Sequence, residues 1–320
     1  MRTLRRHPRA VAAAAIALGV AAIVVLALLA GLRTPAWHPW WLALVVGGHA
    51  VAYVGYAIAY CAMTDLEVPK AWRLVLAGFG AHTVAGGFGF DTRALRGAGR
   101  RNRPVVRVLG LGALEWALLA PAAWVCAVIV LVRGGHSHVQ GALLWSWAIA
   151  VPVGFAIGLS VASPARVRRL ESRDGWRGSL HRPLAAVGML RELLTHPVHG
   201  WRAWLGMAAY WTADIASFYG ALRCFGLPLG VDLAVLAYAT GYAATRRSLP
   251  LGGAAVTEVL MALSLRWVGV PLAEAIVPVA LYRVVSFGLP AVPALAARER
   301  LEPLLRRDER MSDGTAVVRR

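Results

Sequence analysis

The sequence predicts an all-α integral membrane protein, a polytopic helical bundle of about 6–8 spans. The chain has 320 residues, of which 58% are hydrophobic and only 16% charged, and its mean hydropathy is +0.59. Soluble domains are about 45–50% apolar and about 25% charged. The apolar residues gather into long runs, and a helix needs about 20 of them to cross a bilayer. The basic residues lie mainly in the short segments between these runs.

The runs define the expected helices in chain order. Apolar stretches cover residues 10–32, 40–62, 74–90, 105–132, 142–163, 203–225, 231–245, 249–265 and 270–297. The first is longer than the apolar region of a signal peptide, about 7–15 residues, so we expect it to be a span. The expected organisation is a basic N-terminus at 1–9, a membrane domain at 10–297 and a charged tail at 298–320. Residues 183–199 predict an interfacial helix with one apolar face.

Arginine is distributed unequally among the connecting segments. Residues 1–9 carry four Arg, residues 91–107 carry six and residues 165–202 carry eight. The connections at 33–39, 133–141 and 223–232 carry one Arg each. The positive-inside rule therefore places the Arg-rich segments and both termini in the cytoplasm. The Ala- and Arg-rich composition is typical of a GC-rich bacterial genome, so we expect a multi-pass protein of a bacterial plasma membrane.

Two regions are expected to contain re-entrant segments. Residues 74–90 are short and rich in Gly, and both flanking segments carry cytoplasmic charges, which favours a segment that enters and returns. Residues 231–265 are broken between Arg246 and Gly253 and predict either two thin spans or one re-entrant hairpin. With the hairpin, halves 10–132 and 142–297 would be inverted repeats, an arrangement found in many transporters.

Ionisable residues within apolar stretches are the candidate functional residues, because a charge near the bilayer centre costs about 2.5–3.5 kcal/mol. The candidate substrate-binding residues are Glu258, Arg283, Arg246, Arg247, Gly252, Gly253, Asp214, Glu115, Gly86, Gly87 and Asp91. Two interpretations remain open. Buried pairs, such as Glu258 with Arg283, would fix helix packing. Alternatively, the arginines and the free N–H groups at a Gly-Gly break would bind a phosphate in a polar chamber.

Several other functions are excluded by the residues present. The carboxylates of Asp91, Glu115 and Asp214 have no accompanying nucleophile or metal constellation, so we expect no enzyme, no metal and no cofactor. The three Cys have no zinc-type spacing. The net charge of +18 does not indicate nucleic-acid binding, because no basic patch with interleaved aromatic residues lies outside the apolar stretches.

One part of the sequence resembles a known family. Leu249–Glu258, followed by Gly269-Val270-Pro271 and by Tyr282-Arg283, is similar to the C-terminal signature of the lysylphosphatidylglycerol synthase transmembrane-region family. Gly86–Arg93 resembles the family's first Gly-rich motif more loosely. The resemblance implies an all-helical membrane domain with re-entrant elements. It also implies movement of aminoacylated phosphatidylglycerol between leaflets, with Glu258 and Arg283 lining the cavity.

The sequence departs from the family pattern in two ways. Ala255 replaces the third Gly of the motif, and Leu251 replaces the Pro beside the Gly pair, so we expect a different geometry at this tip. The aminoacyl-transferase domain of the best-known members is not visible in the sequence, which implies translocation of the lipid without its synthesis.

The expected function is therefore that of a flippase-like protein for a phosphate-bearing lipid or a similar anionic amphiphile. The alternative is a non-catalytic membrane scaffold subunit, with a lipid- or glycan-modifying enzyme as its protein partner. The buried charges distinguish the two, because closed one-to-one pairs in a dry core would favour the scaffold.

Overall fold

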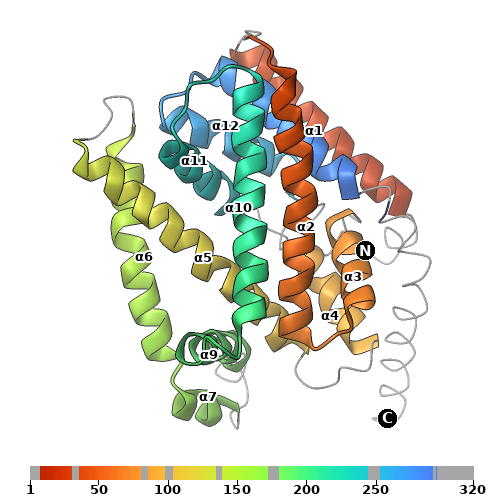
Figure 1. The fold of residues 1–320 in the computed structure, drawn as a ribbon, viewed down its shortest axis with the longest axis vertical. Coiled ribbons are helices and arrows are strands. Elements are labelled where there is room, and N and C mark those ends of the chain that lie inside the picture. The colour runs from red at the N-terminus through yellow and green to blue at the C-terminus, as the bar shows by residue number, and fades with distance from the viewer. Residues whose placement is uncertain are drawn as a thin grey trace.

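The computed structural model describes most of the chain as helix. The described residues are 8–30, 36–80, 86–97, 104–134, 139–171, 180–243, 253–290 and 293. They contain no β-strand, which confirms the all-α fold class. The helices are α1 (Pro8–Ala30), η2 (Pro39–Trp41), α2 (Leu42–Thr64), α3 (Val68–Gly80), α4 (Gly86–Gly97), α5 (Pro104–Val132), α6 (Gly141–Val161), α7 (Pro164–Glu171), α9 (His181–Thr195), α10 (Trp201–Cys224), α11 (Val231–Ala243), α12 (Val256–Trp267) and the last helix Leu272–Pro290 (Figure 1).

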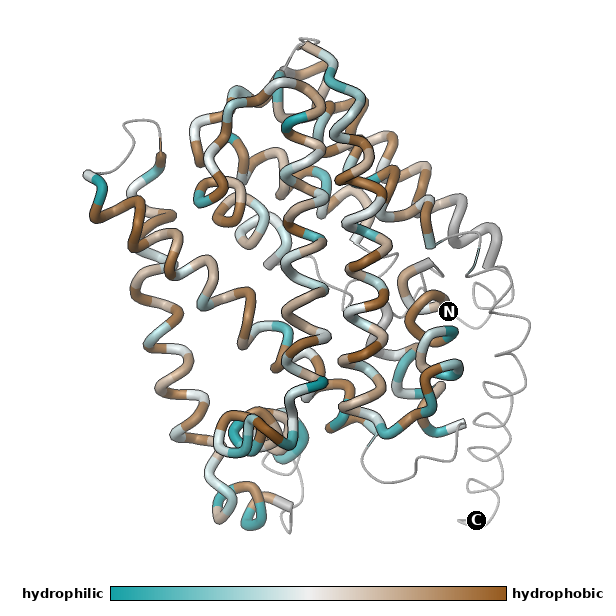
Figure 2. The backbone as a smooth tube through the Cα atoms, in the orientation of Figure 1, coloured by the Kyte–Doolittle hydropathy of each residue, from teal (hydrophilic) through white to brown (hydrophobic). Residues whose placement is uncertain are grey.

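Four helices in the described part of the chain are long and apolar enough to cross a membrane. They are Pro39–Thr64, Pro104–Val132, Gly141–Val161 and Leu272–Pro290. Many of their large apolar side chains are exposed, among them Val54 on α2 and Ile157 on α6, as lipid-facing residues would be. Hydrophilic residues gather instead around α7 and α9, at one end of the bundle (Figure 2). By length and composition, the chain has the architecture of a helical membrane protein.

The centre of the bundle is an antiparallel pair, α2 and α10, which lie side by side along most of their length (Figure 1). Glycines allow their backbones to touch. A Cβ on Gly55 would lie 2.7 Å from the carbonyl oxygen of Gly206, and one on Gly48 would lie 2.7 Å from that of Ala213. Small residues commonly mediate such close helix packing in membranes. The helix α10 carries two buried polar residues, Asp214 and Ser217, on its packed side.

The end of α2 and the start of α5 meet at one end of the bundle. Arg107 at the start of α5 forms a 2.6 Å ion pair with Asp65, which ends α2. The helices α3 and α4, which lie between these residues in the sequence, pack against each other. The chain therefore leaves this end of the bundle and returns to it (Figure 1). The helix α9 lies at the same end and buries Ala185, Ala186 and Leu190, in the region of the predicted interfacial helix.

The short helices α11 and α12 each have one terminus at the opposite end of the bundle. At this end, the amide of His38 donates to the carbonyl of Cys224 at 2.7 Å. Asp232, at the start of α11, lies 3.5 Å from Arg133. The amide of Gln140 donates to the carbonyl of Trp267, the last residue of α12, at 3.0 Å. Thus α11 begins, and α12 ends, at the end of the bundle where α2 begins.

The expected boundaries differ from the structure at two places. The predicted segment 74–90 is two helices, and α4 continues to Gly97, into the segment predicted as a connection. Asp91, Ala94 and Leu95 are buried there, because they share one face at helical spacing and α4 packs on α5 with α3 beside it. Within the predicted stretch 249–265, α12 begins at Val256, directly after a tight turn at Gly253–Ala255.

Candidate functional site

The first buried charged group is an ion pair between α12 and the last helix. The Nε atom of Arg283 donates to Oε1 of Glu258 at 2.8 Å. Glu258 is 1% exposed and Arg283 is 6% exposed. The guanidinium carbon also lies 3.9 Å from the ring centroid of Phe287, one turn further along the last helix, a cation–π distance. The sequence-based pairing of Glu258 with Arg283 is therefore present in the structure.

A tight turn places Glu258 in the first turn of α12. Gly253 and Ala255 have φ values of 74° and 69°, and the hydroxyl of Thr257 donates to the carbonyl of Gly253 at 2.9 Å. A carboxylate in the first turn of a helix is stabilised by the helix dipole. Ala255 has ψ −48°, a conformation that only Gly adopts without strain. It is the position at which the family resemblance led us to expect Gly.

The helix α1 covers the carboxylate of Glu258. Gly19 is a buried residue on a helix that is otherwise mostly exposed where its side chains are described. A Cβ on Gly19 would lie 3.3 Å from Oε1 of Glu258. The missing side chain therefore lets α1 approach the ion pair directly.

The ion pair leaves polar atoms unused. Among the described residues, neither Oε2 of Glu258 nor Nη2 of Arg283 has a hydrogen-bond partner, although both atoms are buried. A guanidinium has five N–H donors, and a carboxylate can accept at both oxygens. The contact is thus not the closed, two-point fork that Arg and Glu often form. One donor atom and one acceptor atom remain able to bind a polar ligand.

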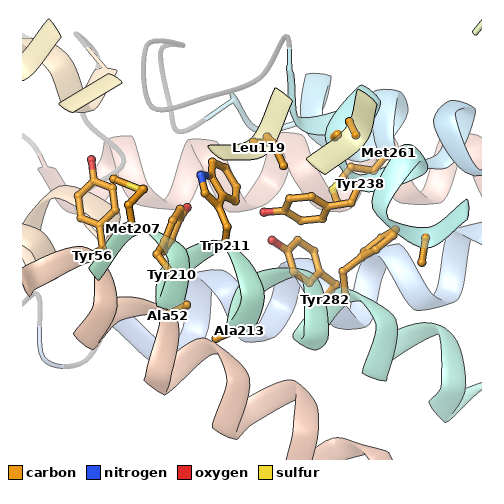
Figure 3. Close-up of a cluster of buried hydrophobic side chains, with 14 of the residues drawn as sticks. Ala52, Tyr56, Leu119, Met207, Tyr210, Trp211, Ala213, Tyr238, Met261 and Tyr282 are labelled. Carbon is orange, nitrogen blue, oxygen red and sulfur yellow. The ribbon is translucent and has the colours of Figure 1, made fainter. Parts of the chain in front are cut away.

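The second buried charge, Asp214 on α10, has a different environment. Its carboxylate accepts a hydrogen bond from the hydroxyl of Tyr238 on α11, and another from Tyr282 at 3.1 Å to each oxygen. The Nε2 atom of His49 on α2 lies 3.5 Å from Oδ1. In Figure 3, Tyr238 and Tyr282 extend from different helices, and their hydroxyl groups lie next to one another.

The Glu258–Arg283 ion pair and the cluster around Asp214 lie at a similar depth along the bundle. Measured from the end where α2 begins, His49, Asp214 and Arg283 are about 10–16 Å along their helices at 1.5 Å per residue. Tyr282 connects the two groups, because its hydroxyl binds Asp214 and its neighbour in the chain is Arg283. This depth is roughly the middle of a 30 Å hydrocarbon core.

The sequence analysis missed the tyrosines and His49, which together form much of the surroundings of Asp214. The largest fully buried side chains include Tyr56, Tyr60, Tyr210, Tyr238 and Tyr282. A signal was present, because Tyr53, Tyr56 and Tyr60 recur at helical spacing on one face of α2. A buried Tyr hydroxyl requires a hydrogen-bond partner, so such a row on an apolar stretch indicates a polar interior.

The other sequence candidates are placed as follows. Glu115 is buried on α5, and its backbone carbonyl accepts a 2.9 Å hydrogen bond from the indole of Trp211. Asp91 is 2% exposed on α4, a helix that begins with Gly86 and Gly87. Gly253 lies in the turn before α12. The three remaining candidates, Arg246, Arg247 and Gly252, lie outside the described residues.

A separate groove of about 1100 Å³ lies at the end of the bundle near α7 and α9. Its lining includes Met63, Arg107, Arg168 and Arg191. Met63 is 14 residues from His49 on α2, about 20 Å along the helix. The groove is therefore distinct from the buried polar groups at mid-depth.

Fold and site together define a helical membrane protein with polar side chains buried at the middle of its long helices. No family model, curated protein or solved structure matches the chain. Among the described residues, no group of three or more His, Cys, Asp or Glu could hold a metal ion.

Proposed function

We propose that the chain is a flippase-like membrane protein that moves a phosphate-bearing lipid between the leaflets of a bacterial plasma membrane. The observation that carries this proposal is the half-satisfied pair of Glu258 and Arg283. Burying two charges costs several kcal/mol per ion unless their hydrogen-bonding capacity is used. A site with one buried donor and one buried acceptor to spare is suited to a polar headgroup that passes through it.

The two unused atoms favour a headgroup with both charges. Nη2 of Arg283 can donate to a phosphate oxygen, since guanidinium and phosphate match in geometry. Oε2 of Glu258 can accept from an ammonium group. Aminoacyl-phosphatidylglycerol carries both groups, which agrees with the lipid implied by the resemblance to the lysylphosphatidylglycerol synthase transmembrane-region family.

The arrangement of the helices supports a transport function. We interpret the pairs α3–α4 and α11–α12 as re-entrant hairpins, because each starts and returns at one end of the bundle, and the two use opposite ends. In this interpretation, the halves 10–132 and 142–297 are inverted repeats with about 6–8 spans in total. Both termini would be cytoplasmic, on the side of the Arg-rich segments.

One observation favours the alternative of a non-catalytic scaffold. The 2.8 Å contact of Arg283 with Glu258 and the stacking on Phe287 would fix the position of the last helix even without a ligand. A scaffold would use this pair for packing and would bind a lipid- or glycan-modifying enzyme elsewhere. The unused atoms are unexplained by that role, so we place it second.

The test is headgroup translocation in vesicles reconstituted with purified protein and a fluorescent aminoacyl-phosphatidylglycerol. Arg283→Lys should slow translocation roughly tenfold or more, because it removes the planar donor fork. Arg266→Lys, at an exposed position in the last turn of α12, is the matched control and should behave as wild type. If wild type and Arg283→Lys translocate equally, the site is wrong. If wild type moves no lipid, the scaffold function is favoured.

A further inference from the structure

The inference begins with the ring of His49, which is 1% exposed. Its Nδ1 atom lies 2.9 Å from the carbonyl oxygen of Val45, one turn earlier on α2. A carbonyl oxygen can only accept, so Nδ1 must carry the hydrogen. This fixes the tautomer of the neutral ring, in which Nε2 would hold a lone pair.

That lone pair would face a second acceptor. Nε2 of His49 lies 3.5 Å from Oδ1 of Asp214, and an ionised carboxylate is acceptor-only. Two acceptors facing each other in a buried site are unfavourable, since neither can bond to water. One added proton removes the conflict, either on Nε2, giving an imidazolium beside a carboxylate, or on Asp214, giving a carboxylic acid that donates to the ring.

No other described group supplies a hydrogen between Nε2 of His49 and Oδ1 of Asp214. Tyr238 and Tyr282 face Asp214 from α11 and the last helix, and both are neutral donors. Tyr53 on α2 uses its hydroxyl to bond the carbonyl of Ser286. Tyr210 on α10 and Tyr242 on α11 also interact electrostatically with this cluster, and Ser217 on α10 donates its hydroxyl to the carbonyl of Ala213 at 3.0 Å.

The nearby cation is already used. Arg283 follows Tyr282 in the chain, but its Nε atom binds Glu258 of α12 at 2.8 Å. Among the described residues, Asp214 has no Arg or Lys within ion-pair distance. Within the described part of the chain, the added proton between His49 and Asp214 is therefore what balances the charge of this carboxylate.

We propose that His49 and Asp214, with Tyr238 and Tyr282, form a proton-binding site between α2 and α10. The site takes up one proton from water and releases one proton to water, and no other bond is made or broken. A further step rests on the proposed function: proton exchange drives headgroup translocation. Tyr282 provides the connection, because a change at Asp214 alters the hydrogen bonds of the residue adjacent to Arg283.

The proton site is tested directly by ¹⁵N nuclear magnetic resonance of histidine-labelled protein in lipid nanodiscs at neutral pH. The His49→Gln variant assigns the His49 signals by their loss. If His49→Gln does not fold, the shift of these signals in Asp214→Asn assigns them instead. Infrared difference spectra between wild type and Asp214→Asn report a protonated carboxyl group. His38→Gln, at the end of the bundle, is the matched control and should leave the His49 signals unchanged.

Two results support the site and one overturns it. An imidazolium at His49, or a neutral ring with a protonated Asp214, places the proton as proposed. A neutral His49 together with an ionised Asp214 overturns the proposal. In Asp214→Asn, His49 should be neutral, with its hydrogen on Nδ1.

The coupling is tested in vesicles with an imposed pH gradient. Translocation by wild type should depend on the gradient, and His49→Gln and Asp214→Asn should lose that dependence. Translocation that ignores the gradient overturns the coupling but leaves the flippase function intact. If wild type moves no lipid, the proposed function fails, while the resonance and infrared results still decide whether the proton site exists.

Discussion

Glu258 and Asp214 are both buried carboxylates at similar depth, yet the structure stabilises them in different ways. Glu258 has a cation, Arg283, at 2.8 Å and one oxygen to spare. Asp214 has no such cation among the described residues, and its oxygens are occupied by Tyr238 and Tyr282, with His49 beside them. The first site is balanced in charge but incomplete in hydrogen bonds.

The second site is the reverse. The hydrogen bonds of Asp214 are nearly complete, while its charge depends on a proton near His49. In a medium of low polarity, charge and hydrogen bonds must both be balanced. Under the two proposals above, a headgroup would complete the hydrogen bonds at Glu258, and a proton would complete the charge balance at Asp214.

The largest effect is expected for Arg283→Ala, which leaves Glu258 buried without its cation. Removing one partner of a buried pair costs about 3–5 kcal/mol in the free energy of unfolding. The double variant Arg283→Ala/Glu258→Gln should recover much of this loss, because no unpaired charge remains. Denaturant titration in mixed micelles measures both. Equal losses in the single and double variants would contradict the ion-pair interpretation.

A smaller effect is expected for Tyr282→Phe. This change removes a hydroxyl that donates to both oxygens of Asp214, and a hydrogen bond to a charged group contributes about 1.5–3 kcal/mol. The same titration measures it, with Tyr219→Phe near the end of α10 as the control. A loss no larger than that of the control would mean that Asp214 does not depend on its tyrosines.

The geometry between His49 and Asp214 can be changed without altering either side chain. A Cβ on Gly48 would lie 2.3 Å from the hydroxyl of Ser217 and 2.7 Å from the carbonyl of Ala213. Gly48→Ala should therefore push α2 away from α10 and cost about 1–3 kcal/mol. Gly47→Ala is the matched control, since nothing lies within 4 Å of its Cβ. The control should be at least as stable as wild type, because Ala has a higher helix propensity than Gly, and a comparable loss there would contradict close packing at Gly48.

The smallest change sharpens the comparison at the Glu258 site. Ala255→Gly should stabilise the protein by about 1 kcal/mol, because relief of an unfavourable backbone conformation outweighs the added flexibility of the unfolded chain. Ala254→Gly, at the neighbouring position, should give no stabilisation because the backbone of Ala254 does not have a positive φ. A destabilised Ala255→Gly variant would show that the turn before α12 differs from the one described.

Much of the fold could be predicted from the sequence because long apolar runs have few structures available to them. The stretch 105–132 corresponds closely to α5, and 203–225 corresponds to α10. Hydropathy failed at α4, where a half-polar helix is buried between neighbours. The average hydropathy of such a segment does not reveal which face is covered, so residues 91–97 of α4 were predicted as a connection.

The charged residues of the site could be predicted from the sequence, whereas the contact between His49 and Asp214 could not. Glu258 and Arg283 stand out because charges are rare in apolar stretches, and their pairing follows from opposite sign. The contact of His49 with Asp214 depends instead on how α2 crosses α10, and that crossing is set by glycines on both helices. A single sequence shows the glycines but not which helix they meet.

The modest hydropathy of α10 has a consequence for how the protein is made. Arg202, Asp214 and Arg223 make this helix a poor candidate for leaving the translocon into lipid by itself. Its Gly206 must meet Gly55 of α2, a helix synthesised about 150 residues earlier. Insertion of α10 would then wait until α2 is held nearby, because α2 would shield the polar residues of α10 from lipid. Substitutions that widen the contact would appear first as degraded nascent chains, before any change in the mature protein.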